Sequence, residues 1–466
     1  MEQKHYKTML LIVAFILIQP VIDILTTASI LYIDFPITVG IVLRVLYLIG
    51  MSGFLVWMAT KSKRAKAYFI YLAGLGGILL INFVVNYLTK DPYLLVEELT
   101  FYSKVVYFHV LFFGFLAIFQ ELQRMGTKIS HLLIRYFVII GTTIGIVFVL
   151  AHLTNTSLAN YARSKEGWTA WFYAGNEIGA AMAIILPVVA LYAIYKTTHW
   201  KQAYYWVPFI LLSFGLLALG TKVGYGGVLL TILVGLFASG LFYFVKKDRS
   251  KRVRTNFVIT AFLLIILLVI TPVTPVFGNM FAHLNILGFD VTKEDVLDKK
   301  AKDKDKNADM ISELPQLTGD QLENLVFSSR EQYRANYKEQ FQDAPFIQKA
   351  FGMGYAGNYE EPRRHQPLKT IEMDFHDWFY SFGYIGFLYF VAPLIYFSIM
   401  YIGQFIHHFK ASWNYFNLLT GSSFIIGLGI AYTAGHVFTA PAVSIYMAFL
   451  FASMIVAIYN EGEQII

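Results

Sequence analysis

Long apolar segments recur along the whole of this 466-residue chain, and they constrain its fold more than any other feature. About 20 apolar residues in helical conformation cross the hydrocarbon core of a bilayer. Backbone polar groups in lipid must be satisfied within the spanning element, which favours helices. The sequence therefore predicts an all-α polytopic integral membrane protein. About twelve spans are expected, at 9–33, 37–59, 67–88, 99–120, 131–153, 177–195, 203–221, 223–245, 256–278, 377–404, 413–434 and 438–459.

The composition agrees with this class. Hydrophobic residues make up 57% of the chain and charged residues 14%, whereas soluble domains carry about 25% charged residues. The first apolar run is too long for a signal peptide and lacks a small-residue cleavage site, so it is interpreted as the first span. Cysteine is absent, which excludes disulfides and thiolate metal sites. No acidic pair has a persuasive metal-binding spacing, so no metal or cofactor is expected.

The basic residues indicate the orientation of the chain. Connections expected inside are basic in nearly every case, whereas the short outer connections 90–98 and 434–441 carry almost no net positive charge. Both termini are therefore predicted to be cytoplasmic. The net charge of +7 reflects this bias rather than a surface for nucleic acid. The basic inner connections are 61–66, 121–128, 196–201, 246–254 and 407–410.

The spans divide the chain into three parts: nine spans in 1–278, a large extracellular loop in 279–376, and three spans in 377–466. The loop opens with the hydrophilic tract VTKEDVLDKKAKDKDKNADM at 291–310, whose composition is typical of a solvated insert. The later stretch SSREQYRANYKEQFQDAP, at 328–345, is predicted to be helical.

The boundaries of this loop helix have sequence signals. Ser328 and Glu331 have the spacing of a capping box, and Pro345 ends the run. On the helix, Arg330, Arg334, Tyr337 and Phe341 would share one face, because they are spaced i, i+4, i+7 and i+11. The macrodipole disfavours a cation at a helix start, so Arg330 is not explained by helix stability. A solvated face is one reading; a surface for phosphate and sugar is the other.

Three ionisable residues lie within predicted spans, in the half nearer the outside. Asp23, Arg44 and Lys104 lie roughly 8–15 Å below the outer ends of their spans at ~1.5 Å per residue. One interpretation is a buried Asp23–Arg44 pair, with Lys104 extended to the interface. The other is an outward-opening polar cavity, lined with cations, for an anionic ligand such as a pyrophosphate. Lys222 at an outer turn and Arg163 in an outer loop add to the second reading.

A titratable cluster stands directly before the tenth predicted span, in IEMDFHDWFYSFGYIGF at 371–387. It contains Glu372, Asp374, His376 and Asp377. Asp377 is expected to cap the span, because a carboxylate suits a helix N-terminus. The other three are candidates for proton transfer at the membrane surface.

These segments together resemble the O-antigen ligase and O-antigen polymerase superfamily. The resemblance rests on a helix that begins with Arg, a P…G-x-G turn, the titratable cluster, and a span with an early G-x-x-G. The turn is formed by Pro345, Gly352 and Gly354, and the span motif by Gly383 and Gly386.

Two earlier segments match in the same order. RSKEGWTAWFYAGNEIG is similar to the family's outer-loop R…G…N…G pattern, and GTKVGYGG is similar to its S-R-G turn. The resemblance covers 155–405, together with the twelve-span layout. The matching residues are Arg163, Gly167, Asn176, Gly179, Thr221 and Lys222.

Two departures from the family pattern affect the expected roles. Lys222 stands where the family usually has Arg, which keeps the charge without the bidentate fork. The family's catalytic His typically lies about eleven residues before the G-x-x-G, where this chain has Glu372. His376 would then serve from one turn later, or Glu372 and Asp374 would take the role. In having acidic residues at this place, the chain resembles family members among Gram-positive surface-polysaccharide enzymes.

The resemblance implies an inverting, metal-independent glycosyl transfer at the outer face of the bacterial plasma membrane. The donor would be a glycan on polyprenyl pyrophosphate, and the acceptor a lipid-linked glycan, a wall glycan or a lipid core. A base would deprotonate the acceptor, and cations would hold the leaving group. The expected catalytic residues are Arg330, Glu372, Asp374 and His376. The expected substrate-binding residues are Arg44, Arg163, Asn176, Lys222, Arg334 and Tyr337.

Two other classes of function fit a polytopic chain. A flippase for lipid-linked oligosaccharides would also have twelve spans and an outward cationic cavity. Transporters usually show internal repeats and helices broken near the midplane, and the sequence shows neither. A non-catalytic receptor or assembly protein would leave the charges of the outer half unexplained. The sequence does not identify the sugar or the acceptor, and it does not distinguish a ligase from a polymerase.

Overall fold

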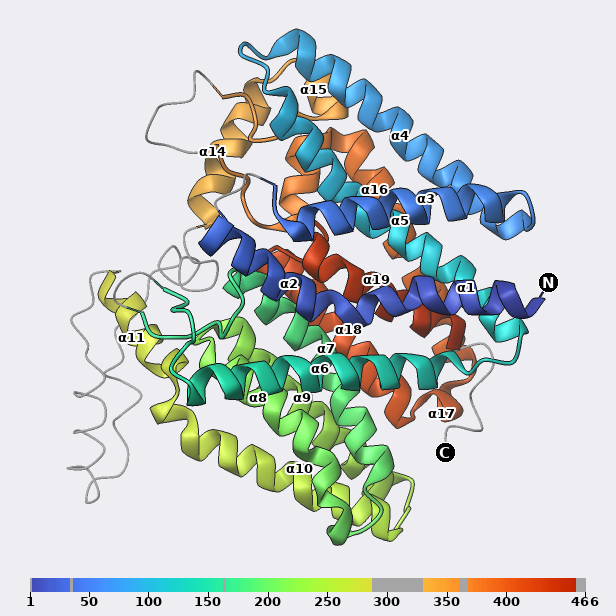
Figure 1. The fold of residues 1–466 in the computed structure, drawn as a ribbon, viewed down its shortest axis with the longest axis vertical. Coiled ribbons are helices and arrows are strands. Elements are labelled where there is room, and N and C mark those ends of the chain that lie inside the picture. Colours follow the sequence, from blue (N-terminus) through green and yellow to red (C-terminus); the bar gives the residue numbers. More distant parts are fainter. Residues whose placement is uncertain (1, 34–36, 162–164, 287–329, 360–367, 458–466) are drawn as a thin grey trace.

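A computed structural model describes residues 2–33, 37–161, 165–286, 330–359 and 368–457 (Figure 1). The predicted site residue Arg163, the capping residue Ser328 and the tract 291–310 lie outside these residues.

Within the described residues, ten helical segments are long and apolar enough to cross a membrane. They correspond to ten of the predicted spans, and the prediction of an all-α polytopic membrane protein is confirmed. The segments are His5–Ile33, which joins α1 (Glu2–Ala14) and α2 (Gln19–Ala28), then α3 (Val39–Ala59), α4 (Lys63–Thr89), α5 (Leu95–Arg124), α6 (Ile129–Leu153), α7 (Gly175–Lys196), Lys222–Val245 with α9 (Lys222–Gly240), Lys251–Val273 with α10 (Lys251–Ile270), α16 (Asp374–His407) and α18 (Tyr415–Thr433).

The two other predicted spans, 203–221 and 438–459, fall on shorter apolar helices. These are α8 (Val207–Ala218), which follows a 3-10 helix at Trp200–Trp206, and α19 (Pro441–Ala457). The total of twelve spans stays a prediction. Among the described residues, the remaining α-helices are α11 (Pro275–Ile286), α14 (Arg330–Asp343), α15 (Phe346–Phe351) and α17 (Phe409–Ser412).

The helices differ in how deeply they are buried. α7 and α19 are enclosed almost all round by other helices, and α19 packs along α5. α3, α4 and α10 instead leave many large apolar side chains exposed, as expected where a helix faces lipid. The apolar composition of the spans thus serves two purposes, because the central helices form the core and the outer ones meet hydrocarbon.

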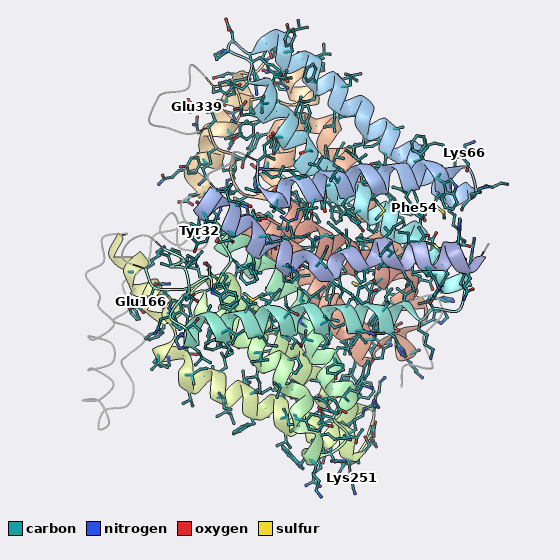
Figure 2. All side chains as sticks on the ribbon, in the orientation of Figure 1. Tyr32, Phe54, Lys66, Glu166, Lys251 and Glu339 are labelled. Carbon is teal, nitrogen blue, oxygen red and sulfur yellow. The ribbon has the colours of Figure 1, made fainter. Side chains whose placement is uncertain are left out.

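The two ends of the helical bundle carry different parts of the chain. In Figure 1, α11 and α14 lie at the left end, whereas the start of α1 and α17 lie at the right. Figure 2 shows Glu166 and Glu339 at the left end and Lys66 at the right. We call the end that carries α14 the loop end. The N-terminus and the basic connections 61–66 and 407–410 therefore lie opposite the loop helices.

The P…G-x-G turn packs against a break in α16. Gly383 has φ +66° and ψ −171°, which interrupts the helix. Gly352 has φ +94°, and a Cβ there would lie 2.1 Å from the carbonyl oxygen of Ser381. The backbone N–H of Gly354 donates to that carbonyl at 2.9 Å. The glycines are needed because two stretches of backbone touch.

Side chains of α4 and α5 hold this turn in place. Asn82 Nδ2 donates to the carbonyl oxygen of Phe351 at 2.5 Å. Lys90 and Glu98 form a buried ion pair with an N–O distance of 2.8 Å. Glu98 also accepts from the backbone N–H of Tyr355 at 2.9 Å, and Lys90 donates to the carbonyl of the same residue at 2.9 Å. The loop helices are thereby fixed to the bundle.

α14 confirms the predicted loop helix. It begins at Arg330 and ends at Asp343, two residues before Pro345, which then caps α15. Tyr337 and Phe341 point into a small core at the loop end, with 4% and 5% of their surface exposed. This core fixes how α14 lies over the start of α16.

Candidate active site

Glu372 lies at the centre of a charged group at the loop end. Its carboxylate is 3.0 Å from Lys369 Nζ, 3.3 Å from an Arg330 guanidinium nitrogen and 3.8 Å from His436 Nε2. The Glu372 side chain is 24% exposed, so it is accessible but partly desolvated. These four residues come from α14, from the segment before α16, and from the connection between α18 and α19.

Unusual backbone conformations bring Glu372 and His436 together. Both have φ +63°, a left-handed conformation that is uncommon outside glycine. Gly435 has φ +65°, and a Cβ there would lie 2.4 Å from the Glu372 carbonyl oxygen, so only glycine lets the two segments touch. Such conformations cost free energy and cluster at functional sites.

Asp374 holds the connection that carries His436. The carboxylate is fully buried and accepts from the backbone N–H groups of His436, Val437 and Phe438 at 3.1, 2.8 and 2.8 Å. It also accepts from the Thr439 hydroxyl at 2.5 Å. These four bonds occupy the acceptor positions of the carboxylate. The geometry makes Asp374 a positioning residue for His436.

Asp377 fixes the chain on both sides of Glu372. Its two carboxylate oxygens accept from the backbone N–H groups of Ile371 at 2.8 Å and Met373 at 3.2 Å. The side chain is buried one turn inside α16. Asp377 was expected to cap the span, but no side chain caps α16; from inside the helix, Asp377 instead fixes the segment that precedes it.

The pKa values of Glu372 and His436 shift in opposite directions, because the two side chains interact. Burial raises the pKa of Glu372, but His436 and Lys369 outweigh it and hold the pKa at about 2. Burial lowers the pKa of His436, but its interaction with Glu372, with added charge from Glu177 and Asp374, raises the pKa above the ordinary 6.5. Glu372 is therefore a weak base, whereas His436 is a stronger base than an ordinary imidazole once it is neutral.

Further cations approach Arg330 from another part of the loop end. Lys165 and Arg330 both lie within electrostatic range of Lys222. The segment with Lys165 is held against the turn before α9, since a Cβ at Gly167 would lie 2.2 Å from the Leu219 carbonyl oxygen. Burial lowers the pKa of Lys165. We call Lys165, Lys222 and Arg330 the cation group.

The turn before α9 follows from its sequence. Thr221 caps the helix, with its hydroxyl accepting from Gly224 N–H at 3.0 Å, so Lys222 is the first helical residue. Gly220 has φ +67°, and Asn279 Nδ2 donates to its carbonyl oxygen at 2.8 Å. This turn separates α8 from α9 within LGTKVGYGG.

His376 and Tyr337 lie beside the Glu372 group in other surroundings. His376 is half-buried, and it lies within electrostatic range of Arg334 and 5.8 Å from the ring of Tyr432. The Tyr337 hydroxyl donates to the Lys369 carbonyl oxygen at 2.9 Å, and its ring is in the loop-end core.

Arg44 does not belong to the Glu372 group, because it lies in the membrane-spanning helix α3. Arg44 forms an ion pair with Asp23, and its Nε donates to Gln19 Oε1 at 3.1 Å. The paired arrangement is therefore present. Arg44, Asp23 and Lys104 also line a cavity of about 350 Å³. Asn176 is exposed at the start of α7.

Three residues of the site were not among those expected from the sequence: His436, Lys369 and Lys165. His436 lies in AGHVFTAP, which the sequence analysis used only to count charge. A Gly followed by a titratable residue in a short connection was the available signal. Lys369 and Lys165 each stand within three residues of a predicted site residue, Glu372 and Arg163 respectively.

The described residues contain no group of three His, Cys, Asp or Glu side chains arranged to hold a metal ion. The donors near Glu372 are mostly cations, which repel a metal ion.

Comparison with known families gives a match over nearly the whole chain. The model of the O-antigen ligase like membrane protein family matches residues 3–461, nearly the whole chain. Comparison with curated proteins and with solved structures finds no match. The family resemblance drawn from the motifs is thus confirmed. The chain belongs to the O-antigen ligase-like family of membrane proteins.

Proposed function

We propose that this protein transfers a glycan from a polyprenyl-pyrophosphate donor to a hydroxyl of an acceptor glycan or lipid-linked acceptor. Family membership supports a glycosyl-transfer enzyme that ligates or polymerises membrane glycans and acts on lipid-linked substrates. The observation that carries the finer proposal is the arrangement of Glu372. It couples a histidine on one side to the cation group on the other.

His436 is the proposed base. An acceptor hydroxyl gives its proton to neutral His436, and its oxygen attacks the anomeric carbon of the donor. Glu372 stabilises the imidazolium that forms, as the carboxylate does in a Ser-His-Asp triad. Because Nε2 of His436 faces Glu372, Nδ1 is left to take the proton. Glu372 itself is poorly suited to the task, since its pKa is held at about 2.

The cation group is proposed to hold the leaving pyrophosphate. As the new bond forms, the bond from the anomeric carbon to the phosphate oxygen breaks, and its electron pair leaves with the pyrophosphate. Arg330 binds phosphate oxygens bidentately, and Lys222 and Lys165 add point charges. Fixed cations stabilise the charge that develops in the transition state without a metal. A single displacement of this kind inverts the anomeric configuration.

The proposed orientation puts the loop end at the outer face of the bacterial plasma membrane, with both termini in the cytoplasm. Segment 279–376 would then be extracellular, between spans in 1–278 and 377–466. The support is the position of the basic connections opposite α14. The candidate site lies at the loop end rather than at the midplane, which favours transfer over transport.

The test is transfer in vesicles that contain the purified full-length chain and lipid-linked glycan from the producing cells. We expect His436→Gln to reduce transfer by about 100-fold or more, the usual contribution of general acid–base catalysis. His131→Gln, a substitution of an exposed histidine at the start of α6, is the matched control. Full transfer by His436→Gln would exclude the proposed base. A parent protein that cleaves no donor would exclude the proposed function.

A further inference from the structure

A cavity with a mixed apolar and polar lining lies near the Glu372 group. It is the cavity of about 350 Å³ between α2, α3, α5, α7 and the start of α19. This size lies within the range of roughly 300–1,000 Å³ that small-molecule sites occupy. Its surface is largely apolar, with Ile41 and Val45 of α3 and Phe172 among the lining residues, but several charged and hydroxyl groups reach into it.

The charges that line the cavity balance. Arg44 and Lys104 contribute two positive charges, and Asp23 and Glu177 two negative ones. Arg44 is already paired with Asp23. A pyrophosphate in the cavity would meet two carboxylates beside two cations, whereas the cation group places three basic side chains beside the single carboxylate of Glu372. The cavity therefore suits an uncharged ligand better than the anionic ligand that its cations alone suggest.

Polar atoms inside the cavity favour a ligand with polar atoms. Tyr107 lines it and is 2% exposed, and its hydroxyl has no hydrogen-bond partner. A buried polar group without a partner costs about 1–3 kcal/mol, and few are left so in folded proteins. The hydroxyls of Thr26 and Ser103 donate to carbonyls of their own helices, each at 2.8 Å, which leaves oxygen lone pairs to accept. A hydrocarbon tail satisfies none of these groups.

A sugar ring meets both requirements. Its hydroxyls both donate and accept, and its C–H faces pack on apolar and aromatic side chains such as Phe172. It carries no charge to disturb the balance between Arg44, Lys104, Asp23 and Glu177. The mixed lining thus corresponds to a ligand with hydroxyl groups at its edge and apolar faces.

The cavity is connected to the proposed base by two elements. Glu177 lines the cavity and lies within electrostatic range of His436. Pro441 and Ala442 also line it, and they directly follow the connection that Asp374 holds through residues 436–439. A ligand in the cavity therefore lies next to the segment that carries His436.

We propose that this cavity binds the uncharged sugar end of the acceptor glycan, apart from the cation group that receives the donor pyrophosphate. The inference rests on the proposed function, because it assigns the second substrate of that reaction. Donor and acceptor would reach His436 from different sides, the anionic donor from the cation group and the neutral acceptor from the cavity.

Cysteine protection tests this without turnover. The chain has no native Cys, so Ser103→Cys supplies one thiol in the cavity and Thr154→Cys one at the exposed end of α6. The probe is oligosaccharide released by mild acid from the lipid-linked glycan of the producing cells. At about nine times its Kd it should slow labelling of Ser103→Cys about tenfold, by mass action, and leave Thr154→Cys unchanged. No slowing, equal slowing at both positions, or equal slowing by undecaprenyl phosphate alone would overturn the proposal.

Kinetics give a second measurement. Tyr107→Phe removes only the hydroxyl, and we expect KM for the acceptor to rise about tenfold and KM for the donor to change less than twofold. Tyr396→Phe, at an exposed tyrosine of α16, should change neither. An unchanged acceptor KM, or an equal rise for donor and acceptor, would contradict the assignment. Because labelling needs no turnover, a cavity that binds no sugar is distinguishable from an enzyme that transfers none.

Discussion

Two glutamates at the loop end pair with cations, and they differ in what surrounds them. Glu98 and Lys90 are 0% and 1% exposed, and both also bond to the backbone of Tyr355. Glu372 is 24% exposed and faces three cations, with His436 the most distant at 3.8 Å. The first pair is closed and joins the loop to the bundle. The second is partly open to solvent, and its one carboxylate is shared by three basic side chains.

This difference indicates how to separate structure from chemistry in a membrane protein where buried charges are costly. An ion pair whose remaining bonds all go to backbone has no capacity left for a ligand. A carboxylate shared by several partly exposed basic side chains instead lies where a ligand can reach these groups. The position of a charge in the outer half of a span is therefore less informative than the number of its partners.

Removing the closed pair should have the largest effect. Glu98→Ala leaves the Lys90 ammonium buried without its partner, which costs about 3–5 kcal/mol. We expect thermal stability in detergent to fall sharply and transfer to be lost with it. Glu97→Ala, at the exposed neighbouring residue, is the control. Normal stability of Glu98→Ala would mean that the pair does not hold the loop.

The open site should show the opposite behaviour, with activity lost and stability kept. Arg330→Lys retains the charge but loses the bidentate fork. The loss of one charge-assisted contact made in the transition state costs about 2–4 kcal/mol, or roughly 30- to 1,000-fold in rate. Arg124→Lys, at an exposed arginine at the far end of α5, should be neutral. Equal transfer by Arg330→Lys and the parent would remove Arg330 from the site.

The pH dependence sharpens the comparison further. Transfer requires neutral His436, whose pKa Glu372 raises above 6.5, so activity should increase as pH rises through that raised value. In Glu372→Gln the burial remains and the negative charge is lost, so the pKa of His436 falls. The acidic limb of the pH–rate profile should then move to lower pH, while the maximal rate decreases. If the acidic limb of Glu372→Gln stays at the pH of the parent, coupling between Glu372 and His436 is contradicted. His376→Ala is the control, and its acidic limb should lie at the same pH as that of the parent.

Much of the fold was predictable because it depends on local composition. The span at 37–59 follows from its apolar run, and the end of α14 follows from Pro345. An ion pair between Asp23 and Arg44 was one of the two interpretations of these residues, because a charge in a span needs a partner.

The centre of the site was not predictable in the same way. Glu372 and His436 are 64 residues apart, and they meet only because Gly435 packs on the Glu372 backbone. Tyr337 was expected to face substrate because it shares a helical face with Arg330. The same face is apolar at Phe341, and burial of both rings in the loop-end core outweighed the alternative.

The smallest effect should come from the hydrophilic tract 291–310. It is rich in Lys and Asp and has too little apolar content to bury, so it contributes little to a packed core. The site residues Arg330, Glu372 and His436 all lie outside it, and α14 is held to the bundle by its own core. Deletion of 291–310 should therefore leave membrane insertion intact and most of the transfer activity in vesicles. Complete loss of transfer at a normal protein level would show that the tract takes part in the reaction. The loop would then belong with the open Glu372 site rather than serve as a spacer.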